Sequence, residues 1–157
     1  MVDRVDKVTR SRIMKANRGR NTSPEIELRK ALFKIGFRYR IHHNNLPGKP
    51  DIVLKKYRLA VFVHGCFWHG HNCKRHPKSK SHREFWEAKI AKNKQRDSVN
   101  KKELRRLGWR VLTVWECAIR RKKPSIARNP ILNELEGWIK SSGELAIIGE
   151  NGLKEEL

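Results

Sequence analysis

Residues 63–73, Val-His-Gly-Cys-Phe-Trp-His-Gly-His-Asn-Cys, constrain the fold of this chain more than any other stretch. The segment follows an apolar run, and it contains two thiols, three imidazoles and an adjacent pair of aromatic rings. It has too few apolar side chains to fix its shape by burial, so we expect a metal ion to hold it. Thiolate and imidazole are the ligands that zinc prefers in proteins.

A fourth ligand for such a zinc ion comes from a distant part of the chain. If the strand expected at residues 109–115 lies beside the one expected at 59–63, the residue after it reaches the loop. The sequence then predicts a saturated, structural site made of Cys66, His71, Cys73 and Cys117. His69 is an alternative to His71 at this site. The competing hypothesis is three ordinary buried cysteines and a surface histidine.

A carboxylate precedes the apolar run at residues 52–54, in the sequence Pro50-Asp51. Because Mg²⁺ prefers a few hard oxygen ligands plus water and substrate, Asp51 is a candidate magnesium ligand. The strand at 59–63 is expected to end nearby, where the backbone carbonyl of Val63 offers a second oxygen. His64 and His69 follow, and either imidazole has the chemistry to take a proton from water.

Two further carboxylates are candidates for an outer role, in which they orient a histidine or hold a metal-bound water. Glu25 lies on the first predicted long helix, and Asp97 lies on the second. Each has a simpler explanation. Glu25 with Thr22 makes a capping-box pattern, and Asp97 is one acid on a basic, solvated helix. The simpler explanation for Asp51 is that it caps a turn, although the two apolar strands favour the functional interpretation.

Hydrophobic periodicity predicts alternating helices and strands. Helices are expected at residues 22–35, 83–107 and 131–139, and strands at 37–41, 52–54, 59–63 and 109–115. The simplest assembly is one α/β domain with a mixed sheet flanked by helices. We expect a basic arm at residues 1–20 that becomes ordered on DNA, a main domain at 21–140, and a weakly specified tail at 141–157.

The net charge of +21 arises from 37 Lys and Arg against 16 Asp and Glu, spread over most of the chain. Such an excess favours a polyanionic partner, because neutralised phosphates release condensed counterions. Charge alone does not separate a nuclease from a basic RNA-binding protein. We expect no membrane-spanning segment and no signal peptide. The three clustered cysteines are typical of metal ligation in a reducing compartment.

Taken together, these residues resemble the very-short-patch repair (Vsr) endonucleases, from about residue 6 to residue 140. The resemblance is carried by His-Gly-Cys-Phe-Trp-His at 64–69, Leu-Pro-Gly-Lys-Pro-Asp at 46–51, Phe-Trp at 85–86, Arg-Asp at 96–97 and Trp-Glu-Cys at 115–117. One departure is Val63, where a threonine is familiar, although a carbonyl ligand survives that change. Gly70 and Asn72 replace histidines, which makes His71 the better fourth zinc ligand.

The resemblance implies a restriction-endonuclease-like fold, related to the PD-(D/E)xK nucleases but without their lysine. It implies a Mg²⁺-dependent enzyme that nicks one strand of duplex DNA, 5′ to the thymine of a T·G mismatch left by deamination of 5-methylcytosine. In this family pattern Asp51 binds Mg²⁺ with the carbonyl of Val63, and His69 is the general base. Glu25 and His64 complete the site, and the cysteines with His71 bind structural Zn²⁺.

A T·G pair stacks less well than its neighbours, so prying the duplex open costs least there. Phe67 and Trp68, held between zinc ligands, are expected to form a wedge, and family likeness adds Trp86 and Met14. The partners implied are mismatched double-stranded DNA and an accessory mismatch-repair protein, for a monomer in the bacterial cytoplasm near the nucleoid. Two alternatives stay open: a related nuclease that needs no mismatch, and a zinc-dependent DNA-binding module without catalysis.

Overall fold

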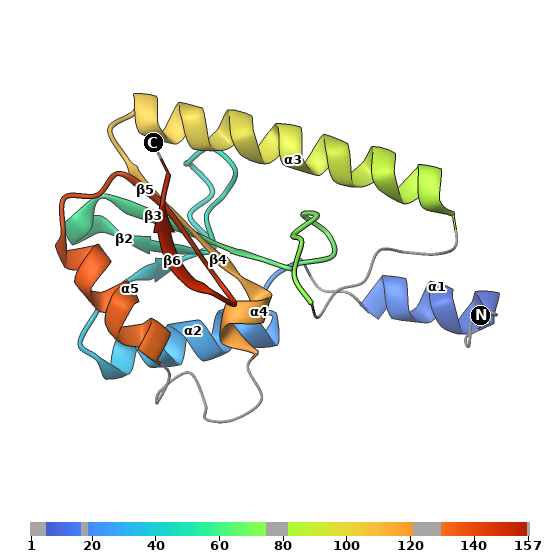
Figure 1. The fold of residues 1–157 in the computed structure, drawn as a ribbon, viewed down its shortest axis with the longest axis horizontal. Helices are drawn as coiled ribbons and strands as arrows, with labels where there is room; N and C mark the ends of the chain where they lie inside the picture. Colours follow the sequence, from blue (N-terminus) through green and yellow to red (C-terminus); the bar gives the residue numbers. More distant parts are fainter. Residues whose placement is uncertain (1–5, 17–18, 75–81, 121–129, 157) are drawn as a thin grey trace.

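The computed structural model describes residues 6–16, 19–74, 82–120 and 130–156. Figure 1 shows a central sheet with the long helix α3 on one side and helices α2, α4 and α5 toward the other. The helices are α1 (Lys7–Ala16), α2 (Ser23–Lys34), the short 3₁₀ helix η1 (Lys55–Tyr57), α3 (Arg83–Arg106), α4 (Glu116–Ile119) and α5 (Pro130–Lys140). No helix in the described ranges is long and apolar enough to cross a membrane.

The six strands pair in the order in which they occur in the chain. They are β1 (Arg40–Ile41), β2 (Ile52–Leu54), β3 (Leu59–His64), β4 (Arg110–Trp115), β5 (Leu145–Gly149) and β6 (Gly152–Glu155). The central strands β3, β4 and β5 run parallel to one another, whereas the outer pairs are antiparallel. The expected mixed sheet flanked by helices is therefore confirmed. The strand expected at 37–41 is present only as the two residues of β1.

Alternate residues of β3 face two different hydrophobic clusters, as the two-residue period of a strand requires. Leu59 and Val61 face the larger cluster, formed with α2, α4 and α5. Ala60 and Phe62 face a smaller one, formed with Leu104 of α3. Both faces of the central strands are thus covered, which explains their nearly continuous apolar sequence. The buried β3 and β4 give the site a rigid base.

Residues 141–157 were expected to form a weakly specified tail, and that expectation is wrong. They contain β5 and β6, and β5 pairs in parallel with the central strand β4. Ala146 and Ile148 are fully buried in the larger cluster, so burial of this short apolar run holds the segment in the sheet. That residues 1–20 form a separate basic arm, which becomes ordered on DNA, stays a prediction.

Candidate active site

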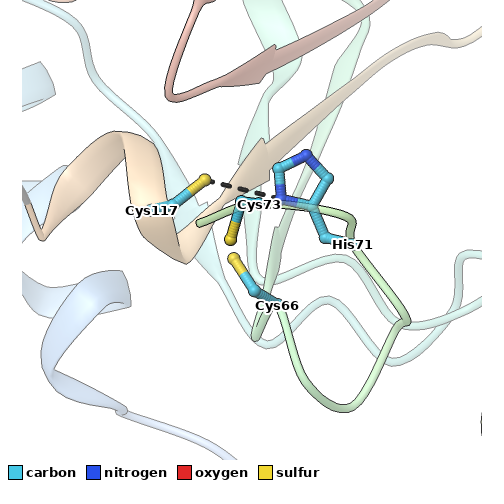
Figure 2. A group of neighbouring side chains, drawn as sticks. All are labelled: Cys66, His71, Cys73 and Cys117. Carbon is cyan, nitrogen blue, oxygen red and sulfur yellow. Dashed lines mark hydrogen bonds between the residues drawn. The ribbon is translucent and has the colours of Figure 1, made fainter. Parts of the chain in front are cut away.

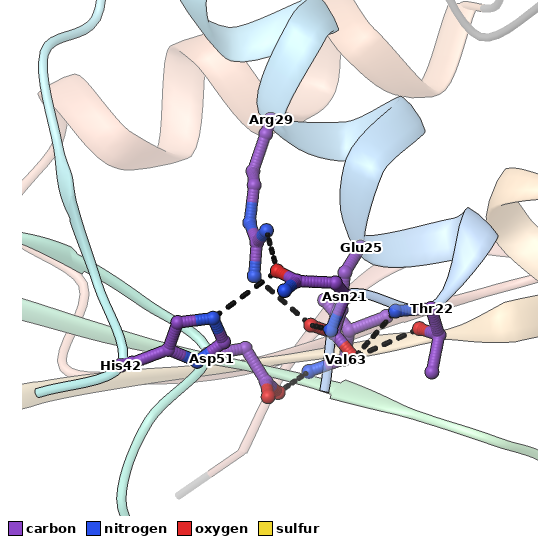
Figure 3. A network of polar contacts seen from close by, with 7 residues as sticks. All are labelled: Asn21, Thr22, Glu25, Arg29, His42, Asp51 and Val63. Carbon is purple, nitrogen blue, oxygen red and sulfur yellow. Dashed lines mark hydrogen bonds and ion pairs between the residues drawn. The ribbon is translucent and has the colours of Figure 1, made fainter. Parts of the chain in front are cut away.

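Asp51 lies immediately before β2 at the edge of β3. Its Oδ2 accepts a hydrogen bond of 2.7 Å from the backbone N–H of Val63, as Figure 3 shows. The N–H and C=O of one residue in an extended strand point toward the same side, so the Val63 carbonyl faces this edge too. Burial raises the pKa of Asp51, and the hydrogen bond from Val63 acts to lower it. Burial has the larger effect, so the pKa is about 6. A divalent cation here would meet a partly desolvated carboxylate and a carbonyl.

Two histidines follow Asp51 in the cleft. His64 ends β3 and is buried, and its ring stacks on that of His69 with centroids 3.8 Å apart and planes 8° apart. Burial, together with the charge of His69, lowers the pKa of His64 to about 3. His64 is therefore neutral near pH 7. A group with so low a pKa is a weak proton acceptor at that pH.

His69 is oriented by a carboxylate from the long helix α3. Its Nδ1 lies 2.5 Å from Oδ2 of Asp97. Burial acts to raise the pKa of Asp97, but the hydrogen bond with His69 and the charges of His64 and His69 outweigh it, so this pKa is lowered. A carboxylate bonded to Nδ1 fixes the orientation of an imidazole and leaves Nε2 for proton transfer.

Glu25 lies in the first turn of α2, is 97% buried and lines the same cleft. Its carboxylate accepts hydrogen bonds from the backbone N–H and the hydroxyl of Thr22, so the capping-box interpretation is confirmed. It also accepts the backbone N–H of Asn21 and pairs with Arg29 at 2.9 Å. The capping role and a place in the cleft therefore hold together.

These groups share one cleft of about 1080 Å³. Its wall brings together the residues expected to be catalytic or to bind Mg²⁺, namely Glu25, Asp51, Val63, His64, His69 and Asp97. Cationic side chains surround these groups, and such a lining suits a phosphate backbone. The cationic residues are Arg20, Lys49, Lys89, Arg96, Lys101 and Arg120. The cleft therefore combines acidic, imidazole and cationic groups of the kinds used in phosphodiester hydrolysis.

The cysteines and one histidine form a second cluster, drawn in Figure 2. Because β3 and β4 are parallel and His64 pairs with Trp115, Cys66 and Cys117 follow the two strand ends side by side. The four candidate ligand atoms, from Cys66, His71, Cys73 and Cys117, all lie within 4.8 Å of one another. His69 belongs to another group, with His64 and Asp97. The structure therefore brings His71, and not His69, to the cysteines.

Burial and proton sharing in this second cluster fit a zinc ion. All three cysteine side chains are buried and none is in a disulfide. The hydrogen bond between Cys66 and Cys117 raises the pKa of Cys66 and lowers that of Cys117 to about 7. The ring of His71 stacks on Trp115 with planes 8° apart. Three buried sulfur donors and the nitrogen of a half-buried histidine, converging on one point, match a closed tetrahedral site.

An aromatic cluster stands at the rim of the cleft. Phe67 and Trp68 from the loop meet Trp86 from α3, with ring centroids between 5.0 and 5.6 Å apart in edge-to-face geometry. The Lys89 ammonium lies 5.8 Å from the Trp68 ring centroid and 5.7 Å from that of Trp86. Three of the expected wedge residues are thus brought together. Met14 lies on α1, and its side chain falls outside what the structure describes.

Three residues beside the cleft were missed by the sequence analysis: Arg29, Asn21 and His42. Arg29 donates 2.7 Å to Oδ1 of Asn21, and Nε2 of His42 lies 3.1 Å from the same oxygen. The spacing of Glu25 and Arg29, four residues apart on a helix, is a recognised ion-pair pattern and was available as a signal. Asn21 and His42 carry no comparable signal.

Comparison with known proteins places the chain in a family. A family model described as DNA mismatch endonuclease Vsr matches residues 2–75. The DNA mismatch endonuclease Vsr of Escherichia coli K12 is 41% identical over 98% of this chain and 97% of its own length. The type II nicking enzyme V.NmeAIP of Neisseria meningitidis is 46% identical over 85% of this chain and 93% of its own.

Among solved structures, the catalytic domain of homing endonuclease I-Bth0305I matches with a TM-score of 0.42 at 21% identity, over 76% of this chain and 89% of that chain. The sequence relatives decide the assignment, because they are similar over nearly the full length of both chains. This chain belongs to the Vsr family of DNA mismatch endonucleases.

Proposed function

We propose that this endonuclease nicks one strand of duplex DNA on the 5′ side of the thymine in a T·G mismatch, and so begins very-short-patch repair. The observation that carries the proposal is the single cleft that holds Asp51 and the His69–Asp97 pair. A metal-binding carboxylate and an oriented imidazole are the two parts that metal-assisted hydrolysis of a phosphodiester requires. The net charge of +21 supplies the affinity for DNA.

Asp51 and the Val63 carbonyl would hold Mg²⁺. The fit rests on oxygen donors at a partly desolvated edge and on the raised pKa of Asp51, because a bound cation would stabilise the charge that burial disfavours. Bound there, Mg²⁺ supplies charge stabilisation for the phosphate and the leaving oxygen. His69 takes the proton of the attacking water at Nε2, while Asp97 keeps the ring oriented. His64 stays neutral and packs against His69.

The three buried cysteines and half-buried His71, namely Cys66, His71, Cys73 and Cys117, would hold a structural Zn²⁺. Four protein ligands leave no open position for water, so this zinc has no place in catalysis. Its effect is to fix the loop that carries His69 and the aromatic rings. Phe67, Trp68 and Trp86, with Met14 from the arm, would open the duplex at the mismatch, with stacking of about 1–3 kcal/mol per base to offset the cost.

A nicking assay across a panel of duplexes tests the proposal. Single-turnover rates with Mg²⁺ are measured on end-labelled duplexes that differ only in one pair: T·G, T·A, C·G and A·C. We expect one nick, 5′ to the thymine of the T·G duplex, and none without Mg²⁺. Equal cutting of T·A and T·G would instead identify a nuclease that needs no mismatch. Binding without cutting under all conditions would identify a DNA-binding module.

The same assay, repeated over a range of enzyme concentrations and with a mismatch-repair accessory protein added, addresses the partners. One asymmetric lesion needs only one active site, so we expect the rate to saturate at one chain per duplex. We place the enzyme in the bacterial cytoplasm with the nucleoid, where its substrate lies. An accessory protein that acts on this step is expected to raise the nicking rate without moving the nick.

A further inference from the structure

Arg29 is a buried cation with a well-defined set of contacts beside the cleft. It is 92% buried, and its two terminal nitrogens reach two partners, one on the same helix and one in the residues just before it. One nitrogen donates 2.9 Å to Glu25 Oε2, and the other donates 2.7 Å to Asn21 Oδ1. In Figure 3 the side chain extends from α2 toward the strand edge that carries Asp51. A buried guanidinium is stable only where such partners satisfy it.

The contacts of Asn21 close a ring. Its backbone N–H donates 3.0 Å to the Glu25 oxygen that Arg29 also binds, and its Oδ1 is shared by Arg29 and His42. Asn21 has φ of 55° and His42 has φ of 53°, both in the left-handed region. Such backbone persists only where its surroundings hold it. These hydrogen bonds thus join α2 to Asn21, which follows the expected arm, and to the loop after β1 that contains His42 and leads toward Asp51.

All the acceptor positions of Glu25 are occupied by the chain itself. One oxygen binds Asn21 and Arg29, and the other binds the N–H and hydroxyl of Thr22. A carboxylate accepts about four hydrogen bonds, so Glu25 has no position left for a metal ion. Arg29 also offsets the charge that Glu25 places near Asp51. Without it, the buried carboxylate of Glu25 and the half-buried one of Asp51 would repel each other and rearrange.

We propose that Arg29 is a positioning residue for the metal site. By holding Glu25 and Asn21, it keeps the first turn of α2 and the Asp51 edge in the arrangement that binds a divalent cation before DNA arrives. This inference rests on the proposed function, because it requires a cation at Asp51. Arg29 itself touches neither the cation nor the DNA. Its removal therefore leaves DNA binding intact, and it weakens metal binding only because the metal site is no longer held in position.

The test uses Arg29→Met, Arg29→Lys and the control Lys30→Met, which removes a cation from the exposed side of the same helix. Mn²⁺ binding to the DNA-free protein is followed by electron paramagnetic resonance, and the Mg²⁺ midpoint of nicking is measured separately. DNA affinity without Mg²⁺ and the melting temperature are recorded for each variant. We expect Arg29→Met to raise both metal midpoints about tenfold, with DNA affinity unchanged. Arg29→Lys restores part of the loss, and Lys30→Met matches the wild type.

An unchanged metal midpoint with a lower melting temperature would show a purely structural residue, and a lower midpoint would show that Arg29 only repels the cation. Either result overturns the inference. Should Arg29→Met fail to fold, Asn21→Gly takes its place, because glycine keeps the positive φ and removes the side-chain oxygen. It should raise the midpoint by a smaller factor, and an unchanged midpoint counts against the inference. Mn²⁺ binding by Asp51→Asn as tight as that of the wild type would refute the metal site itself.

Discussion

Replacing Asp51 with asparagine should stabilise the metal-free protein at neutral pH while abolishing nicking. Burial raises the pKa of this carboxyl from 3.8 to about 6. Between these two values the folded protein binds more protons than the unfolded chain, so folding stability falls as the pH rises through the window. Above pH 6 the full cost is present, and a difference of this size corresponds to roughly 3 kcal/mol.

An asparagine side chain has no charge to desolvate, and its amide oxygen can still accept the N–H of Val63. The difference in unfolding free energy between variant and wild type should therefore be near zero at pH 4 and approach roughly 3 kcal/mol at pH 8. This pattern is expected of a site whose function requires a destabilised charge, which a bound cation then stabilises.

Urea unfolding at a series of pH values between 4 and 8 measures this difference. The buffer contains no added Mg²⁺ and no chelator, so that a structural zinc is not removed. Glu27→Gln, on the exposed side of α2, is the matched control and should show no such pH dependence. A stability difference that does not change with pH, or a variant less stable than the wild type at pH 8, would refute the reasoning.

Three further predictions concern the zinc cluster, the loop and the histidine. Cys117→Ser should lose zinc, measured by atomic emission, and melt at a lower temperature; stoichiometric zinc with full stability would mean that the ligand set is wrong. Gly70→Ala should destabilise by about 1–3 kcal/mol in thermal unfolding, because the added Cβ would lie 2.5 Å from Ile90 and the φ of +64° suits glycine; an unchanged melting temperature would contradict this. Asp97→Asn should slow single-turnover nicking by about 10²–10⁴-fold with unchanged DNA affinity, since it removes the charged partner of His69; a rate within twofold of the wild type would exclude that role.

The cluster of three cysteines and a histidine and the parallel strands beside it were predictable because their signals are local and strong. The apolar runs that became β3 and β4 are each followed two residues later by a cysteine, Cys66 and Cys117. Once those strands are paired, the meeting of the cysteines follows, whereas the choice of His71 over His69 required the structure. The hydrogen bond between His69 and Asp97 was harder to predict from the sequence, because it depends on how α3 crosses the sheet.

Other features depend on tertiary packing. The strand β5 was missed because Leu145–Gly149 is short and lies beyond the last amphipathic helix, where a terminal tail was expected. Its burial beside β4 decides its conformation, as is common for short apolar runs. Asn21 and His42 meet only through left-handed backbone in two separate loops. A pattern based on residue spacing cannot detect such a contact.

The rate of nicking in a double-mutant cycle most directly tests whether Asp51 and His69 act on one phosphodiester. Single-turnover rates on the T·G duplex are compared for the wild type, Asp51→Asn, His69→Ala and the double variant, at saturating enzyme and constant Mg²⁺. If the two residues serve one chemical step, each single change abolishes most of the rate and the double variant loses little more. Nearly wild-type nicking by Asp51→Asn, or losses that multiply in the double variant, would contradict a shared catalytic centre.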